Sequence, residues 1–211
     1  MVARGGTEVL AGELPESVHA HTVVLIGTTG GMGFEAFLCG RRDEPNPMDR
    51  WSKRVVDPIA ASLGVRAAYP NDRPYLPFQR WAQRAEDVHP SPLGLLIHPE
   101  HGLWHAFRAV LLIPGAVEGL PVHAGKASPC ESCAEKPCLG ACPTGAFSGT
   151  SYDVGACAAH LRADTTPRCL ILGCRARDAC PVGTSSRYGD AQIRFHMQAF
   201  ARARGIETVD T

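Results

Sequence analysis

Residues 130–143 read CESCAEKPCLGACP, and the four cysteines of this stretch decide the fold of the second part of the chain. Their spacing is C-x2-C-x4-C-x3-C-P, which has two residues more before the third cysteine than the common bacterial 4Fe–4S run. Three closely spaced thiolates can hold three irons of one cluster, whereas a fourth cysteine followed by proline turns away to a second cluster.

A looser set follows at residues 157–181, with the spacing C-x11-C-x4-C-x5-C-P. It also ends in Cys-Pro, so the same crossing rule gives its last cysteine to the first cluster. Cluster one is then assigned Cys130, Cys133, Cys138 and Cys180. Cluster two is assigned Cys142, Cys157, Cys169 and Cys174. Both ligand sets are complete, which predicts two 4Fe–4S clusters that carry electrons one at a time.

Structural zinc is the alternative, because pairs of CxxC cysteines also bind zinc. Zinc sites seldom carry Cys-Pro after each four-cysteine set, and this chain has it twice. Disulfides would require an oxidising compartment, to which no feature of the sequence points. The remaining cysteine, Cys39, is expected to be an ordinary buried thiol.

The charge balance is neutral, with Lys+Arg and Asp+Glu both at 21. Nucleic acid is therefore not expected as a partner, since phosphate binding favours a basic excess. No apolar run approaches the roughly 20 residues that a membrane span needs, and residues 1–16 do not resemble a secretory signal. We therefore expect a cytoplasmic protein with no membrane partner.

The first part of the chain alternates apolar strands and helices. Residues 21–27 are predicted to form a buried strand, followed by a glycine-rich turn at residues 27–33. A helix is expected from residue 47, capped by Asn46, to residue 63, with a kink or break at Pro58. Its expected apolar stripe comprises Met48, Trp51, Val55, Ile59 and Leu63.

Further along, a strand at residues 65–69 and a helix at residues 76–87 are predicted. Apolar runs at residues 93–98 and 104–113 are expected to pair as an antiparallel hairpin. This mixture favours an α+β fold over a doubly wound parallel sheet. The expected domains are residues 1–126 and 127–211, joined by a link within residues 115–129, and the second ends in a helix that begins near Asp190.

Residues 95–104 (LLIHPEHGLW) resemble the H-P-x-x-G-x-W segment of epoxyqueuosine reductase, a cobalamin-dependent iron–sulfur enzyme of tRNA modification. The cysteine region is similar too, with Cys-Pro-Thr-Gly-Ala at residues 142–146, a single middle cysteine and a final Cys-Pro. The corrinoid reductive dehalogenases share this plan. The chain is much shorter than epoxyqueuosine reductase, it lacks that family's C-terminal helical repeats, and its cysteine spacings are wider.

The first region also resembles the eukaryotic cobalamin-processing protein, a cyanocobalamin decyanase. The similar stretches are NPMD at residues 46–49, PNDRP at 70–74 and IHPEHGLWHAFRAVLLIPG at 97–115. These families imply a nitroreductase-like layer domain followed by a ferredoxin-like two-cluster domain. They also imply base-off cobalamin as a cofactor, and FMN stays an alternative because related nitroreductase folds carry it.

The resemblance places four residues near a corrinoid. His98 would touch a polar edge of it, although a histidine hydrogen-bonded within a strand–turn is an equal reading. Trp104 and Arg108, four apart on one expected strand, would share a face toward the ring, or else be core and surface residues. Arg73 would hold the nucleotide tail, or be an ordinary loop arginine.

The expected function is reduction of base-off cobalamin, with electrons from a low-potential donor such as ferredoxin or flavodoxin. Two alternatives are a ferredoxin-like electron carrier without corrinoid and a short tRNA-modifying enzyme of the epoxyqueuosine reductase type. The catalytic residues, the final acceptor and the oligomeric state are not indicated by the sequence.

Overall fold

The computed structural model describes residues 1–120, 125–163 and 168–206. Contacts divide the chain into two compact units, the first comprising Met1–Val88 and His105–Lys126, the second His89–Trp104 and Ala127–Thr211. The expected first domain, residues 1–126, therefore wrongly includes His89–Trp104, which belong to the second unit. The reason is that Leu93, Ile97 and Leu103 are buried in one cluster with cysteines of the second unit. The expected link at residues 115–129 lies partly outside the described residues.

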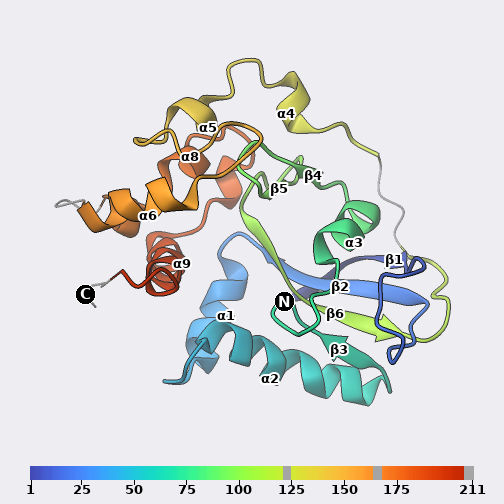
Figure 1. The fold of residues 1–211 in the computed structure, drawn as a ribbon. Coiled ribbons are helices and arrows are strands. Elements are labelled where there is room, and N and C mark those ends of the chain that lie inside the picture. Colours follow the sequence, from blue (N-terminus) through green and yellow to red (C-terminus); the bar gives the residue numbers. More distant parts are fainter. Residues whose placement is uncertain (121–124, 164–167, 207–211) are drawn as a thin grey trace. The chain divides into compact units, whose positions relative to one another are not determined.

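A four-stranded antiparallel sheet with the order β1-β2-β6-β3 forms the centre of the first unit (Figure 1). Its strands are β1 (Val2–Glu8), β2 (Thr22–Thr29), β6 (His105–Ile113) and β3 (Arg66–Ala68). Val24 pairs with Leu111, and Leu25 pairs with Val110. Because side chains alternate along a strand, these two pairs bury opposite faces of the sheet.

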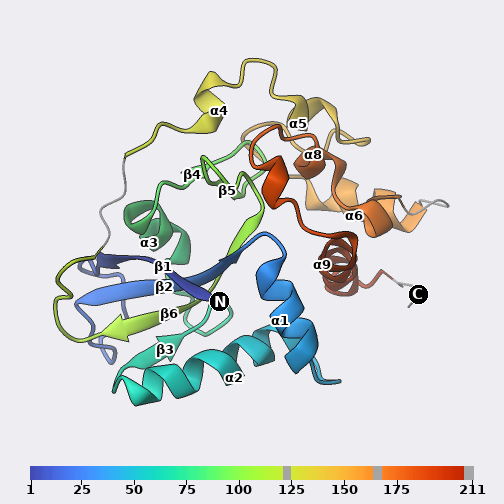
Figure 2. The same ribbon diagram turned by 180° about the vertical axis from the view of Figure 1, so that it is seen from behind.

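Helices cover both faces of this sheet (Figures 1 and 2). On the face of Leu111, α2 (Pro47–Ser62) packs Val56 and Ala60, and α1 (Met32–Gly40) packs beside α2. On the other face α3 (Phe78–Ala85) contacts β1 and β2, with Trp81 fully buried. The α+β prediction is thus confirmed for fold class.

The expected hairpin of residues 93–98 and 104–113 is wrong. The first run contains only the two-residue strand β5 (Leu96–Ile97), which pairs with β4 (His89–Pro90). The second run, β6, pairs with β2 and β3 instead. Pairing with β2 and β3 sets the register of β6 in the sheet of the first unit. Residues 89–104, which precede β6, pack in the second unit instead, so the two apolar runs have different partners.

Details of α2 also differ from expectation. Trp51, Val56 and Ala60 are buried, but Ile59 and Leu63 are 49% and 61% exposed, so the stripe toward the sheet is narrower than the apolar periodicity predicts. The helix runs through Pro58 without a break, and this proline lies on its exposed side. Asn46 precedes the helix in a left-handed conformation and makes no side-chain capping bond.

The second unit consists mainly of short helices. They are α4 (Pro129–Ser132), α5 (Pro137–Gly140), α6 (Val154–Ala163), α7 (Arg168–Leu172), α8 (Arg175–Asp178), the 3-10 helix η1 (Thr184–Ser186) and α9 (Asp190–Arg202). The prediction of a last helix near Asp190 is confirmed, with Ile193 and Ala201 buried. Among the described residues, no helix has the length and apolar character required to span a membrane.

Candidate cluster site

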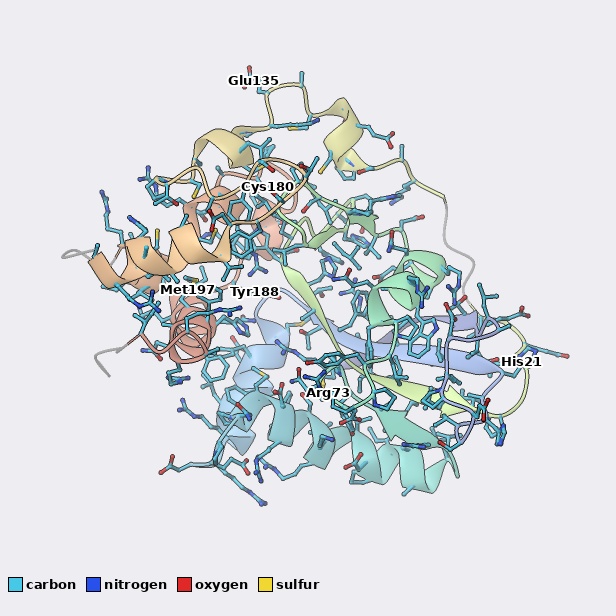
Figure 3. The ribbon with its side chains drawn as sticks, viewed as in Figure 1. His21, Arg73, Glu135, Cys180, Tyr188 and Met197 are labelled. Atoms are coloured by element: carbon cyan, nitrogen blue, oxygen red, sulfur yellow. The ribbon has the colours of Figure 1, made fainter. Side chains whose placement is uncertain are left out.

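The first group of cysteines gathers around α4, α5 and the segment after α8. Burial, and then repulsion from the sulfurs of Cys180, Cys138 and Cys133, raises the pKa of Cys130. Burial, and then repulsion from Cys180 and Cys133, also raises the pKa of Cys138. Cys138 and Cys180 are buried in one apolar cluster of the second unit, and Cys130 packs against it; Figure 3 labels Cys180.

The second group joins the end of the first motif to the second motif. Burial dominates at Cys174 and raises its pKa, and repulsion from Cys157 and Cys142 adds to this effect. Cys169 packs in one apolar cluster with Cys157. Cys142 and Cys174 also pack against the cluster that buries Cys138 and Cys180. The division of the eight cysteines between two clusters stays a prediction.

The turn at residues 142–146 surrounds the Cys142 sulfur with donors. The Thr144 hydroxyl lies 3.5 Å from Cys142 Sγ, and the Ala146 N–H donates to the same sulfur at 3.4 Å. Burial alone would raise the pKa of Cys142, but these bonds and the N–H groups of Thr144 and Gly145 outweigh it and lower the pKa. The turn therefore favours a thiolate at Cys142.

The donor chemistry suits iron–sulfur ligation, because each group offers four sulfurs and backbone N–H groups point at several of them. Within the described ranges, no three His, Cys, Asp or Glu side chains converge on a position for a single metal ion. Sulfurs that hold a cluster bind separate irons, so they stand farther apart than zinc ligands, which lie about 2.3 Å from one ion. Ligation of iron stays a prediction.

His98 lies in a strand–turn, and its side chain makes hydrogen bonds within that turn. Its Nδ1 accepts hydrogen bonds from the N–H groups of Glu100 and His101, at 3.0 and 3.2 Å. Its ring also stacks on that of His101, with the centroids 4.7 Å apart. These contacts favour the strand–turn reading of His98.

Trp104 lies in the second unit and precedes β6, so the expectation that it shares a strand face with Arg108 is wrong. Its ring is 3% exposed, packs edge-on against Tyr188 at 5.4 Å, and lies 4.3 Å below the Arg177 guanidinium. Arg177 also donates to the Leu103 carbonyl. Trp104 is therefore a core residue of the second unit.

A cavity of about 40 Å³ lies beside this core. Trp104, Tyr188, Arg177, His196, Met197 and Cys174 are among its lining residues, and Figure 3 labels Tyr188 and Met197. A water molecule needs roughly 10–15 Å³ of such space, so this cavity can hold water.

The other two residues expected near a corrinoid belong to the first unit. Arg108 is half-buried in β6. Arg73 is exposed, with its guanidinium 3.6 Å from the centroid of the Tyr75 ring. The four residues expected to share one site are thus divided between the two units.

Two features of the cysteine chemistry were not expected from the sequence. Cys39 is exposed, so its assignment as a buried thiol is wrong. His160 lies against a cysteine of the second group, with its Nε2 3.8 Å from Cys169 Sγ. Burial, and then the nearby Cys157, raises the pKa of Tyr152. His160 follows Cys157 by one helical turn, which is the signal that could have identified it.

Comparisons with known proteins give a fold but no family. No family model and no curated protein matches the chain. Among solved structures, epoxyqueuosine reductase from Bacillus subtilis, with its catalytic loop swung out of the active site, matches at a TM-score of 0.51 and 17% identity over 80% of this chain and 50% of that chain.

Two further epoxyqueuosine reductase structures match more weakly. One carries an epoxyqueuosine-modified tRNA-Tyr stem loop and matches at a TM-score of 0.49, with 15% identity over 81% of this chain and 50% of that chain. The selenomethionine-labelled enzyme matches at 0.49, with 15% identity over 83% of this chain and 52% of that chain. The chain spans about half the length of these neighbours.

The epoxyqueuosine reductase part of the resemblance thus agrees with the fold. The resemblance to the cobalamin-processing protein finds no support in these structures, and neither does cobalamin as a cofactor.

Proposed function

We propose that this chain is an iron–sulfur oxidoreductase that holds two 4Fe–4S clusters. The observation that carries the proposal is that the eight cysteines of the two motifs lie in the second unit, seven of them within two apolar clusters. Bound clusters would supply one-electron transfer at low potential. The chain's own residues fix the sulfurs, exclude water around the buried Cys138, Cys169 and Cys180, and donate hydrogen bonds to the sulfurs.

The first unit is the nitroreductase-like layer domain in this proposal, and the second is the two-cluster domain. The electrons would come from a low-potential protein donor such as a ferredoxin or flavodoxin.

The proposal is tested by anaerobic reconstitution followed by metal analysis and EPR. About eight irons per chain and two reducible cluster signals are expected, whereas stoichiometric zinc without iron would overturn the proposal. Cys133→Ala should remove one of the two cluster signals, and Cys157→Ala should remove the other. Cys39→Ala is the matched control and should retain both.

Two electron acceptors are considered. The shared fold favours an epoxyqueuosine-type substrate over free cobalamin. The zero net charge weighs against tRNA binding by this chain. Cobalamin reduction rests on the motif resemblance and stays the second candidate.

Two assays separate the candidates. The first incubates the reduced holoprotein with an epoxyqueuosine-modified tRNA stem loop, with and without cobalamin, and measures product by mass spectrometry. The second titrates the holoprotein with cob(II)alamin and follows the EPR signal for conversion to a base-off form. Conversion without tRNA turnover would favour cobalamin reduction. If the protein gives neither response, the remaining candidate is an electron carrier.

A further inference from the structure

An exposed apolar pair lies at the end of α7 in the second unit. Ile171 and Leu172 are 44% and 49% exposed, although the helix also carries the buried Cys169. Leu172 lines the cavity beside Trp104, and Cys174 lines the same cavity. Two proposed iron ligands, Cys169 and Cys174, thus stand two residues before and two residues after the exposed pair.

Arginines lie around this pair. Arg168 precedes Ile171 by three residues and Leu172 by four, a spacing that places the three side chains on one side of α7. Arg168 is exposed, and so is Arg175 at the start of α8. The Arg187 guanidinium donates to the Leu172 carbonyl at 3.5 Å. These five residues, Arg168, Ile171, Leu172, Arg175 and Arg187, are called the α7 surface below.

The charge of this part of the chain is strongly positive. The described range 168–206 holds seven arginines, two aspartates and no lysine or glutamate. The two aspartates, Asp178 and Asp190, both pair with Arg187. In the described range 125–163, by contrast, three basic residues balance three acidic ones. The zero net charge of the whole chain therefore conceals a local basic excess around the α7 surface.

An apolar centre within a basic rim favours a protein partner. Protein interfaces combine an apolar core with a polar rim, and opposite charges on the two partners steer and orient their encounter. The α7 surface therefore fits a partner whose contact surface is acidic. A nucleic acid would use the arginines, but it gains little from aliphatic side chains, because bases stack on aromatic ones.

We propose that the α7 surface docks an acidic electron-transfer protein, and that electrons enter at the cluster held by Cys169 and Cys174. This inference rests on the proposed function, since it requires that the cluster be bound. Electron transfer slows steeply with distance, and the two ligands beside the exposed pair make this surface a short route to the iron. In the step, the reduced donor loses one electron and the cluster gains it, with no bond or proton exchanged.

The test is anaerobic stopped-flow measurement of electron transfer from a reduced 2Fe–2S ferredoxin of negative net charge to the reconstituted holoprotein. The rate constant should fall as ionic strength rises, because salt screens the attraction. Arg168→Glu and Arg175→Glu should each lower it by about ten-fold at low ionic strength. Ile171→Ser keeps the charge and should lower the rate at low and high ionic strength alike.

Arg42→Glu is the matched control. It makes the same change in net charge at an exposed arginine of the first unit, and it should stay close to the wild-type rate. Iron content and the extent of reduction by dithionite should be equal in all variants, which shows that their clusters are intact.

The outcomes separate this inference from the proposed function. A rate that does not depend on ionic strength, or that falls equally in Arg42→Glu and Arg168→Glu, overturns the docking surface while the two-cluster protein stands. The same holds if Arg168→Glu and Arg175→Glu abolish binding of a tRNA stem loop but leave reduction by ferredoxin unchanged, since the surface is then a nucleic-acid interface. A protein that binds no iron overturns both the proposed function and this inference.

Discussion

Gly102 lies directly against the backbone of Val182. A Cβ atom added to Gly102 would overlap the Val182 carbonyl oxygen and lie 2.7 Å from its carbonyl carbon. The relationship is reciprocal, since a Cβ atom on Gly183 would overlap the backbone of His101. The loop of residues 98–102 and the segment that follows Cys180-Pro181 therefore fit together only because both carry glycine.

Gly102→Ala should consequently destabilise the second unit and reduce its iron content. Gly102 has a φ of +56°, so alanine would bear about 1–2 kcal/mol of left-handed strain and roughly 1–3 kcal/mol for the overlap. The measurement is thermal unfolding of the holoprotein together with iron per chain.

Gly94→Ala is the matched control for this variant. Gly94 also has a positive φ, +71°, but nothing lies within 4 Å of its added Cβ atom. It should show the conformational strain alone, with full iron content. Equal losses in the two variants would mean that the contact with Val182 contributes nothing.

The cysteine groups can be predicted from the sequence because their spacing is a local feature. Short spacings place three sulfurs on one loop, and the Cys-Pro step identifies the residue that leaves for the other cluster. What it missed is non-local. The loop before β6 packs with the second unit through Leu93, Ile97 and Leu103, and no periodicity within residues 93–113 encodes that partner.

The elements of the first unit show the same division. The strand at residues 21–27 and the helix around Trp81 were predicted correctly, because each has a strong apolar pattern of its own. Strand β1 was not predicted, since Gly5 and Gly6 interrupt its apolar pattern, and its pairing with β2 supplies the order that its sequence lacks. On α2, apolar residues occur on both sides, so periodicity alone could not identify the buried face.

Glu13 should make the first unit lose stability in acid, from the ordinary titration range of a glutamate down to about pH 2. Its side chain is 6% exposed, accepts from Arg84 at 2.7 and 3.0 Å, and accepts from the Trp81 indole at 2.7 Å. Burial alone would raise the pKa of Glu13, but these bonds and the Leu10 N–H lower it to about 2. The pKa of a glutamate carboxyl in the unfolded chain is near 4.3, so in the folded state Glu13 stays ionised to lower pH.

The stabilisation by Glu13 is therefore complete above about pH 5 and is lost as the pH falls toward 2, amounting to roughly 3 kcal/mol. Glu13→Gln should remove this pH dependence and destabilise the unit by about 2–4 kcal/mol at neutral pH, because Arg84 loses its partner. Denaturant unfolding at pH 3 and pH 7 measures both effects. Glu16→Gln is the control, since Glu16 is exposed. A wild-type pH slope in Glu13→Gln would contradict the prediction.

Cys39 should be the one cysteine that reacts readily with iodoacetamide in the holoprotein. It is exposed, whereas the other eight cysteines are the proposed iron ligands. Mass spectrometry should find one adduct in the loaded protein and nine after chelation of iron and unfolding, nine being the total number of cysteines. More than one rapid adduct in fully loaded protein would show that a cysteine of the two groups does not bind iron.

Arg177 should resist replacement even by lysine. Its guanidinium lies 4.3 Å from the Trp104 ring centroid and 4.8 Å from that of Tyr188, and it donates to the Leu103 carbonyl. Lysine keeps the charge, but it lacks the planar group that can stack on both rings and still donate sideways. Arg177→Lys should therefore cost about 1–2 kcal/mol, a sum of weakened cation–π contacts and one hydrogen bond.

Arg175→Lys, an exposed change on the same short helix, is the comparison for Arg177→Lys and should be close to neutral. Denaturant unfolding of both holoproteins, followed by tryptophan fluorescence, gives the difference. If the two variants unfold at the same denaturant concentration, the charge of Arg177 alone stabilises the core around Trp104, and the stacking geometry contributes nothing.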